Sequence, residues 1–390
     1  MEQNVILKRG KEVIFRNRHL WIFSGAIESY PKGYQEGAIY PVCSSKGDLL
    51  GHAYFHSKQS LAGRIVSFGD EDPWQGICRH LDQAINLRKA LFHPQETNAF
   101  RLVNGEGDHL PGLVIDQYGE YLVLQSGTLG IDLLKEKIVT YLMEKGVWKG
   151  VFEKSSSGSR KEEGLQDQIK VLAGTPCENI EIIENGVRFR VNWEKGQKTG
   201  FFLDQREMRL LVKKMSRGRK VLNCFSYTGG FSIYALQGGA AAVDSLDISA
   251  AALAMGKEHL HMNGGTDVPV QWIEQDAFDF LRNDSLNYDL VILDPPAFVK
   301  KKRDLAQGIR GYREINHQAM SKMPRGSFLL TCSCSYYLDE AEFRTLLFQA
   351  AEKAEREVQV IHESFHAPDH PLNLFHPEGR YLKSFLLYLT

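Results

Sequence analysis

The chain has 390 residues, of which 43% are hydrophobic and 24% are charged, and its formal net charge is −1. This length exceeds what one hydrophobic core supports and predicts two or three domains. The charge argues against a protein that coats nucleic acid over its whole surface, although a local basic patch is compatible with it. No apolar run is long enough for a transmembrane helix, and the N-terminus has no signal-peptide pattern, so we expect a cytoplasmic protein.

The six cysteines form no CxxC pair, and no His/Cys spacing suggests a zinc site. Free thiols in or beside apolar runs suit a reducing compartment. His366, His370 and His376 lie in a proline-containing loop, where we expect surface residues and no metal ligands.

Residues 1–75 contain short alternating apolar runs separated by turn residues, which predicts a small all-β barrel. The basic residues Lys8, Arg9 and Arg16 precede Trp21 and form either a solvated face or a surface for RNA. The segments 7–10, 19–27 and 51–55 resemble those of a PUA domain, an RNA-binding β-barrel. That resemblance implies that Lys8, Arg9 and Arg16 contact RNA.

Residues 76–190 predict an α+β spacer domain without evident chemistry. Helical periodicity covers 77–91 and 131–144, and a glycine-rich turn divides two strands within 101–116. The polar stretch 155–168 reads as an exposed loop. Asn185-Gly186 lies between two alternating runs and predicts a β-hairpin.

Residues 191–390 alternate between strands and helices, which is the doubly wound α/β pattern. The predicted strands are 220–224, 242–247, 268–274, 288–294, 327–333, 357–362 and 383–389. The main predicted helices are 231–237, 250–263, 308–323 and 339–355. The last two strands suit a terminal antiparallel hairpin.

The first of these strands leads into Asn223-Cys-Phe-Ser-Tyr-Thr-Gly-Gly-Phe231. Small residues allow a ligand close to the backbone, and the following helix start offers free N–H groups. The spacing is not that of the dinucleotide fingerprint. It resembles motif I of the S-adenosylmethionine (SAM) methyltransferases, although Asn223 replaces the acidic residue often found there. This resemblance implies cofactor contacts from Asn223, Phe225, Ser226, Tyr227, Thr228 and Gly229; the alternative is a purely structural turn.

Two further strands end on acidic residues. Asp247, followed by Ile248, ends the second strand, where a carboxylate can accept both ribose hydroxyls. Asp276 and Ala277 follow the third strand, where the resemblance places the adenine. We therefore expect all four residues to contact the cofactor, although an aspartate at a strand end is also a common helix cap.

The apolar run 288–293 ends in Asp294-Pro-Pro-Ala-Phe298. The prolines hold an extended corner at the carboxyl end of a buried strand, where open α/β sheets bind ligands. The corner resembles the substrate-base loop of nucleic-acid methyltransferases. Lys300, Lys301 and Arg303 follow it and are either a solvated run or, as we predict, contacts for RNA phosphates.

Cys332 and Cys334 occur at a spacing of two near the end of the fifth strand, so both share one face beside Asp294. Buried cysteines are often structural. A thiolate can instead add to C6 of cytosine, which gives C5 enamine character and makes it reactive toward a methyl group. Asp294 could then stabilise charge on the ring.

Over nearly all its length the chain resembles the RlmI-type ribosomal RNA large-subunit cytosine-C5 methyltransferases. Residues 198–206, Lys-Thr-Gly-Phe-Phe-Leu-Asp-Gln-Arg, add to this resemblance and imply that Thr199, Gln205 and Asp294 lie against SAM. The resemblance implies a PUA barrel in 1–75, a spacer in 76–190 and a Rossmann-like seven-stranded SAM methyltransferase domain in 191–390. The resemblance assigns the nucleophile to Cys332, with Cys334 as a competitor. Ala297 stands where many such enzymes carry a second cysteine, so the residue that assists release of the nucleophile stays open.

We therefore expect a SAM-dependent enzyme that forms S-adenosylhomocysteine and acts on ribosomal RNA, without a metal or a membrane. Whether it forms a homodimer stays open. Methylation of an exocyclic amine or a guanine, with structural cysteines, is the second hypothesis, and a non-catalytic RNA-binding ribosome-assembly factor is the third. A nicotinamide dehydrogenase is the weakest, because the fingerprint fails.

Overall fold

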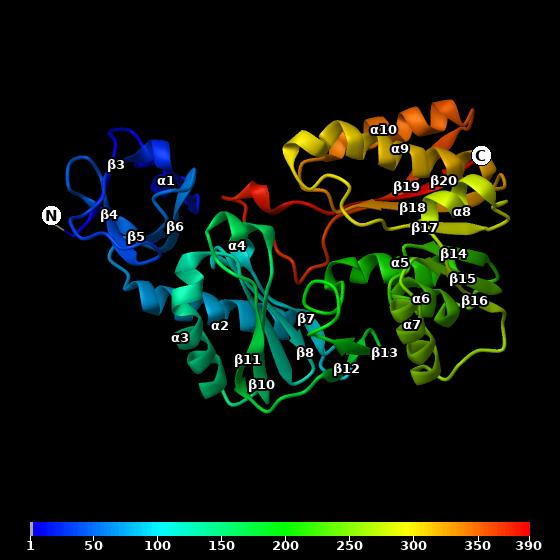
Figure 1. Ribbon diagram of the computed structural model, residues 1–390, viewed down its shortest axis with the longest axis horizontal. Helices are drawn as coiled ribbons and strands as arrows, with labels where there is room; N and C mark the ends of the chain where they lie inside the picture. The colour runs from blue at the N-terminus through cyan, green and yellow to red at the C-terminus, as the bar shows by residue number, and fades with distance from the viewer. Residues whose placement is uncertain (1–2) are drawn as a thin grey trace. The chain divides into compact units, whose positions relative to one another are not determined.

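The computed structural model describes residues 3–390, which divide by their internal contacts into two compact units. Of the described residues, unit 1 consists of 3–186, Val191–Leu203 and Pro368–Gly379. Unit 2 consists of Val187–Arg190, Asp204–Ala367 and Arg380–Thr390. Figure 1 shows the elements of both units in chain order. The predicted domain boundaries at 75 and 190 stay predictions.

The first sheet of unit 1 has six strands in the order β2-β6-β5-β4-β1-β3, which confirms the predicted all-β segment. Its strands are β1 (Val5–Leu7), β2 (Trp21–Phe23), β3 (Ile27–Ser29), β4 (Ile39–Cys43), β5 (Leu49–Phe55) and β6 (Leu61–Phe68). The short helix α1 (Val13–Arg16) lies between β1 and β2. Alternate side chains such as Val5, Ile22 and Phe55 turn inward and are fully buried, as the period of two requires.

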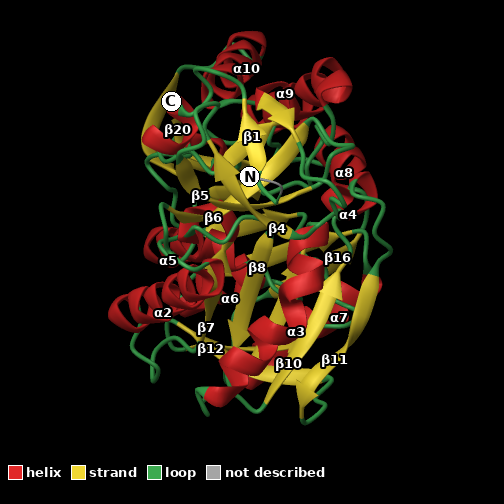
Figure 2. Ribbon diagram, turned by 90° about the vertical axis from the view of Figure 1, so that its left-hand side faces the viewer, coloured by secondary structure: helices red, strands yellow, loops and turns green. Residues whose placement is uncertain are grey.

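The second sheet of unit 1 has the order β11-β10-β9-β8-β7. Its strands are β7 (Ala99–Asn104), β8 (Leu113–Tyr118), β9 (Tyr121–Ser126), β10 (Gly150–Ser155) and β11 (Gln168–Gly174). Helices α2 (Pro73–Leu91) and α3 (Leu129–Glu144) pack on it and share one hydrophobic cluster with it (Figure 2). The Asp72 side chain caps α2 and Pro73 occupies its first turn, which explains where this helix begins.

The prediction of an exposed loop over 155–168 is wrong in part. This stretch contains the short helix α4 (Gly158–Glu162), and the Arg160 side chain is buried. Its guanidinium donates to the Asp132 carboxylate at 2.6 Å and to the carbonyl of Ser126 at 3.0 Å. A buried arginine needs such partners, so α4 is an anchored segment.

The predicted hairpin is confirmed by β12 (Asn179–Glu184) and β13 (Val187–Asn192). Asn185 and Gly186 between them have φ values of 50° and 77°. Two successive positive φ values are those of a type I′ turn, for which Asn-Gly is the preferred sequence.

Segment Pro368–Gly379 belongs to unit 1, although the residues directly before and after it belong to unit 2. Arg88 on α2 donates to the Asp108 carboxylate at 2.6 Å and to the Asp369 carbonyl at 2.7 Å. The expectation that the histidines of this region are surface residues is wrong: His370 and His376 are buried, and His366 is half-buried.

The sheet of unit 2 has seven strands in the order β16-β15-β14-β17-β18-β20-β19. Its strands are β14 (Lys220–Cys224), β15 (Ala242–Asp247), β16 (Val270–Glu274), β17 (Leu290–Leu293), β18 (Ser327–Ser333), β19 (Val358–Ser364) and β20 (Lys383–Leu389). The strands β14 to β18 pair in parallel, and β20 is antiparallel to both β18 and β19. The doubly wound pattern and the terminal antiparallel pair are therefore confirmed.

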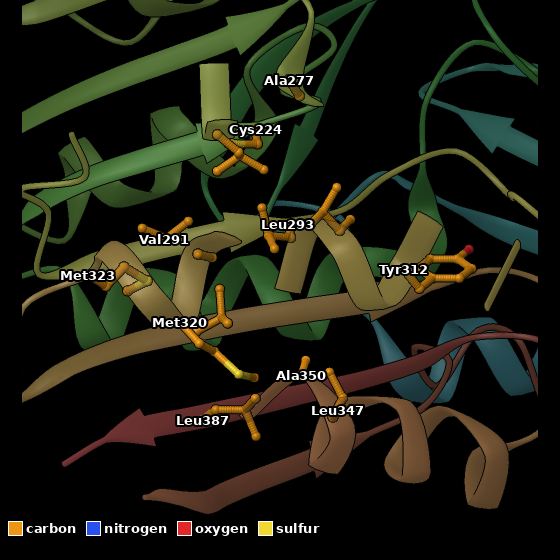
Figure 3. Close-up of a cluster of buried hydrophobic side chains, with 14 of the residues drawn as sticks. Cys224, Ala277, Val291, Leu293, Tyr312, Met320, Met323, Leu347, Ala350 and Leu387 are labelled. Atoms are coloured by element: carbon orange, nitrogen blue, oxygen red, sulfur yellow. The ribbon is translucent and has the colours of Figure 1, made fainter. Parts of the chain in front are cut away.

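Helices cover both faces of this sheet (Figure 1). One face carries α5 (Arg206–Met215), α6 (Gly230–Gln237) and α7 (Ala250–Met262); the other carries α8 (Ala277–Asn283), α9 (Leu305–Lys322) and α10 (Glu340–Lys353). The helix α8 fills a gap between strands, where a helix was expected, whereas α5 precedes the first strand and was not predicted. Figure 3 shows how Leu293 of β17, Met320 of α9 and Leu347 of α10 meet in the core of the second face.

None of the helices within residues 3–390 combines the length and the apolarity that a membrane span requires. All six cysteines are free thiols.

Candidate active site

The loop between β14 and α6 has a strained backbone. Phe225 and Tyr227 adopt positive φ values of 58° and 48°, a region that costs non-glycine residues free energy and is often found at functional sites. The N–H of Ser226 donates to the carbonyl of Leu246 at 2.9 Å, which ties the loop to the end of β15. Gly229 has a φ of 74°, and a Cβ there would lie 2.8 Å from the ring of Trp272. The loop is thus a tight cradle in front of the first turn of α6.

Asp247 at the end of β15 is coupled to this loop. Its Oδ2 accepts the N–H of Tyr227 at 2.8 Å, and its Oδ1 accepts the N–H of Ser249 at 2.9 Å. Each carboxylate oxygen keeps a further lone pair for a ligand hydroxyl. The next residue, Ile248, is 72% exposed, so an apolar surface stands beside a preorganised carboxylate.

Asn223 lies deeper than the sequence suggested. Its side chain is fully buried, and its Nδ2 donates to Ser232 Oγ at 2.9 Å. Ser232 in turn bonds Ser245 at 2.7 Å. The Asn223 amide therefore links β14 to α6, and its role as a direct cofactor contact stays an untested prediction.

His259 on α7 supports the loop from behind, and sequence reasoning missed it. Burial lowers the pKa of His259, which favours the neutral ring. In that form Nδ1–H donates to the Thr228 carbonyl at 2.9 Å, while Nε2 accepts the N–H of Arg190 at 3.0 Å. A histidine on an amphipathic helix has no sequence signal that separates this role from an ordinary surface position.

Asp276 acts as a helix cap. Its Oδ1 accepts the N–H groups of Phe278 at 2.8 Å and Asp279 at 3.1 Å, and Ala277 beside it is buried. The capping alternative thus describes the Asp276 carboxylate, and contacts of Asp276 and Ala277 with the adenine stay predictions. Phe278 packs edge-on against Phe225, with ring centroids 6.5 Å apart.

The Asp294-Pro-Pro corner at the end of β17 meets Gln205, the residue that precedes α5. Gln205 Nε2 donates to Asp294 Oδ1 at 2.9 Å. Because Leu293 pairs with Thr331 in the register of β17 and β18, Asp294 lies beside Cys332. Three predicted site residues are therefore brought together here, and the Gln205 amide fixes the orientation of the carboxylate.

The two cysteines occupy different surroundings. Cys332 is fully buried in the cluster that contains Leu330 and Leu386, and burial together with the nearby Asp294 carboxylate raises the pKa of its thiol far above the usual value. Cys334 follows the last residue of β18 and is partly exposed, with its Sγ 3.9 Å from the carbonyl of Pro295.

A buried lysine holds the segment that follows Cys334. Lys383 Nζ donates to the carbonyls of Ser335 at 2.7 Å and Leu338 at 2.5 Å, and burial lowers its pKa to about 8. Tyr312 on α9 bonds Ser335 Oγ at 2.9 Å. Sequence reasoning missed both residues, because their partners are distant in the chain.

The predicted RNA contacts lie on exposed surface in both units. Lys300, Lys301 and Arg303 follow the corner in unit 2, and Lys8, Arg9 and Arg16 lie in unit 1. Thr199 also belongs to unit 1, where its Oγ1 donates to Asp116 at 2.6 Å. Its contact with a cofactor stays a prediction.

Comparison with known proteins finds matches in both the N-terminal and the C-terminal part of the chain. A family model described as S-adenosylmethionine-dependent methyltransferase matches residues 163–366, and one described as a PUA-like domain matches residues 5–68. Ribosomal RNA large subunit methyltransferase I of Alteromonas mediterranea is 37% identical and covers 100% of both chains. Its counterpart in Erwinia tasmaniensis is 36% identical over 99% of both.

Among solved structures, a SAM-dependent methyltransferase from Streptococcus mutans has a TM-score of 0.84 at 23% identity, with 100% of both chains covered. A methyltransferase complexed with S-adenosylhomocysteine has the same TM-score at 24% identity and the same coverage. At these identities the likeness concerns the fold.

Proposed function

Since the chain belongs to the family of SAM-dependent methyltransferases that includes ribosomal RNA large subunit methyltransferase I, we propose that it methylates a nucleotide of large-subunit ribosomal RNA. The residues around the glycine loop fit SAM. Asp247 has lone pairs free for the ribose hydroxyls, and exposed Ile248 offers a face to the adenine.

We propose that the methylated atom is C5 of a cytosine. The observation that carries this proposal is a partly exposed thiol, Cys334, within 3.9 Å of the Asp-Pro-Pro corner. Cytosine C5 is a poor nucleophile on its own. A group that adds to C6 is therefore needed, and a cysteine thiolate is the side chain best suited to that task.

In the proposed reaction the thiolate attacks C6, and the electron pair of the C5–C6 double bond moves toward the ring carbonyl and N3. Asp294, held by Gln205, lies where it can stabilise charge on N3 and N4. SAM would supply an electrophilic methyl group: the C5–CH₃ bond forms while the S–CH₃ bond breaks, and S-adenosylhomocysteine leaves. A base then removes the C5 proton, the double bond forms again and the thiolate leaves.

The sequence favoured Cys332 as the nucleophile, and that assignment stays untested. The burial of its side chain and the raised pKa of its thiol argue against rapid attack, because the thiolate is the reactive form. Cys334 lies beyond the strand and beside Pro295, next to the segment anchored by Lys383. We therefore propose Cys334 as the nucleophile and a packing role for Cys332.

Large-subunit ribosomal RNA transcribed with 5-fluorocytidine in place of cytidine tests this mechanism. Fluorine cannot leave as a proton, so the wild-type enzyme and SAM should form an adduct that survives denaturing electrophoresis. Cys334→Ala should form no adduct and transfer no methyl group while it still binds SAM. Cys332→Ala is the matched control and should retain the adduct.

The other outcomes are equally informative. If Cys332→Ala abolishes the adduct and Cys334→Ala retains it, the assignment within the pair is wrong. If both variants methylate normally, the thiol mechanism fails, and mass spectrometry of the nucleosides should then show a methylated exocyclic amine or guanine.

A further inference from the structure

Three side chains from distant parts of the sequence converge in unit 1. His19 precedes β2, whereas His376 and Glu378 lie in segment Pro368–Gly379. One nitrogen of each histidine and a carboxylate oxygen of Glu378 all lie within 4.8 Å of one another. His19 Nε2 is 3.2 Å from Glu378 Oε1, and His376 Nδ1 is 3.6 Å from Glu378 Oε2.

The cluster is not satisfied by its own hydrogen bonds. The His376 side chain is 1% exposed, and neither its Nδ1 nor Glu378 Oε2 has a hydrogen-bond partner. Their separation of 3.6 Å is too long for a hydrogen bond. A buried polar atom left without a hydrogen bond destabilises the folded protein. Two such ligand atoms that face one another can both be satisfied by one cation.

The surrounding residues fix both rings. The Trp21 ring lies against His376 with centroids 4.4 Å apart, and its Nε1 donates to Glu106 at 2.9 Å. The N–H of Trp21 donates to His19 Nδ1 at 3.2 Å, and His19 Nε2 faces Glu378. His19 Nδ1 also lies 3.4 Å from the Trp21 carbonyl. When Nε2 of His19 binds a metal, that carbonyl is the acceptor for the Nδ1 proton, the outer contact that metal-bound histidines usually make.

The charge of the cluster suits a cation, because Glu378 and the nearby Glu106 bring negative charge close to His376.

We propose that His19, His376 and Glu378 bind one divalent transition-metal ion, with zinc as the best match. Two imidazoles and one carboxylate form a common protein ligand set for Zn²⁺, with water in the fourth position. The ion fastens segment Pro368–Gly379 to the start of β2, across 359 residues of sequence between His19 and Glu378. The site is independent of methyl transfer and differs from the metal-free protein that the sequence led us to expect.

Calorimetric titration of the full-length, untagged and chelator-treated protein with ZnCl₂ tests the site. We expect saturable binding of one ion per chain, and the Co²⁺ form should show the intense visible absorption of a tetrahedral complex. Glu378→Gln keeps the size of the side chain and should weaken Zn²⁺ binding more than about 100-fold, since even the loss of an outer partner of a ligand costs about 10- to 100-fold. His376→Asn should do the same.

Glu357→Gln and His362→Asn change exposed residues of unit 2 in the same way and should bind Zn²⁺ like the wild type. Circular dichroism and SAM titration establish that each variant is folded. The absence of saturable Zn²⁺ and Co²⁺ binding by the wild type overturns the proposal. Binding that persists in folded Glu378→Gln and His376→Asn also overturns it and would locate the ion elsewhere, for example at the cysteines.

Discussion

Two backbone N–H groups converge on the carboxylate of Asp247, one from Tyr227 and one from Ser249. This residue therefore holds the glycine loop in shape and also presents lone pairs toward the ligand side. Its removal acts on SAM binding through both effects, because a charged acceptor is lost and the strained loop is released.

We predict that Asp247→Ala weakens SAM binding by about 1 to 3 kcal/mol, the range expected for lost charge-assisted hydrogen bonds. Calorimetric titration with SAM and with S-adenosylhomocysteine measures the effect. Asp279→Ala, an exposed aspartate on α8, is the matched control and should bind like the wild type. An unchanged affinity in Asp247→Ala would remove this residue from the cofactor site.

At the scale of the element, the start of α6 depends on a close approach between helix and strand. Gly229 is its N-cap with a left-handed backbone, and the Trp272 ring from β16 lies over it and over Gly256 of α7. Two glycines thus make room for one indole ring. The loop therefore needs glycine at position 229 for space as well as for the left-handed backbone angle.

We predict that Gly229→Ala lowers the free energy of unfolding more than Gly264→Ala does. Gly264 also has a positive φ, of 91°, but a Cβ there meets nothing within 4 Å. Gly264→Ala should cost about 1–2 kcal/mol from backbone strain alone, and Gly229→Ala a further 1–3 kcal/mol, roughly, from crowding against Trp272. Urea unfolding measures both. Equal losses would show that the indole moves aside freely.

The N-terminal β-sheet gives the second prediction at this scale. Lys8, Arg9 and Arg16 are exposed around α1, and the side-chain Nζ of Lys8 donates to the carbonyl of Gly25 at 3.1 Å. Cations in this position remain available for phosphates, whose neutralisation makes affinity fall with salt.

We predict that reversal of these three residues to Glu weakens RNA binding and flattens its dependence on salt, while SAM affinity stays unchanged. Filter binding over a range of salt concentrations measures both quantities. Reversal of three exposed lysines outside this sheet, Lys89, Lys137 and Lys161, is the charge-matched control. An equal loss of RNA affinity in both triple variants would mean that net charge alone matters. No loss of RNA affinity in either would mean that the RNA surface lies elsewhere, with Lys300, Lys301 and Arg303 as the next candidates.

At the scale of the whole molecule, buried histidines make stability depend on pH. His80 on α2 is buried and stacks on His109. The pKa of His80 is lowered to about 4, mainly by burial, then by the charge of Arg79 and then by His109. Gln83 and Glu71 oppose this shift. The unfolded chain, with a histidine pKa of about 6.5, therefore takes up a proton before the folded protein does.

His80 consequently contributes stability above about pH 6.5, and this contribution is lost as the pH falls toward about 4. We predict a loss of about 2 kcal/mol from this residue at about pH 5. Urea midpoints of the wild type and His80→Gln across this range measure it, and the variant should depend less steeply on pH. His362→Gln, an exposed control, should keep the wild-type slope. Parallel curves for all three proteins would contradict the assignment.

The sequence by itself determined the local structure of this protein and the family-specific loops. The alternation of β14 to β18 with helices, the Asn185-Gly186 turn and the glycine loop each leave a pattern within about twenty residues, because strand period, turn angles and helix starts are local properties. The helix α5 escaped prediction because it precedes the first strand of this alternating pattern, so no strand before it indicated a helix there.

Only the tertiary structure decided which side chains meet. It joined Gln205 to Asp294, buried Cys332 while it left Cys334 partly exposed, and returned segment Pro368–Gly379 to unit 1, where Glu378 reaches His19. Residues hundreds of positions apart leave no periodic signal in one sequence, because their proximity depends on strand order and packing. Chains with the same local pattern can differ in both.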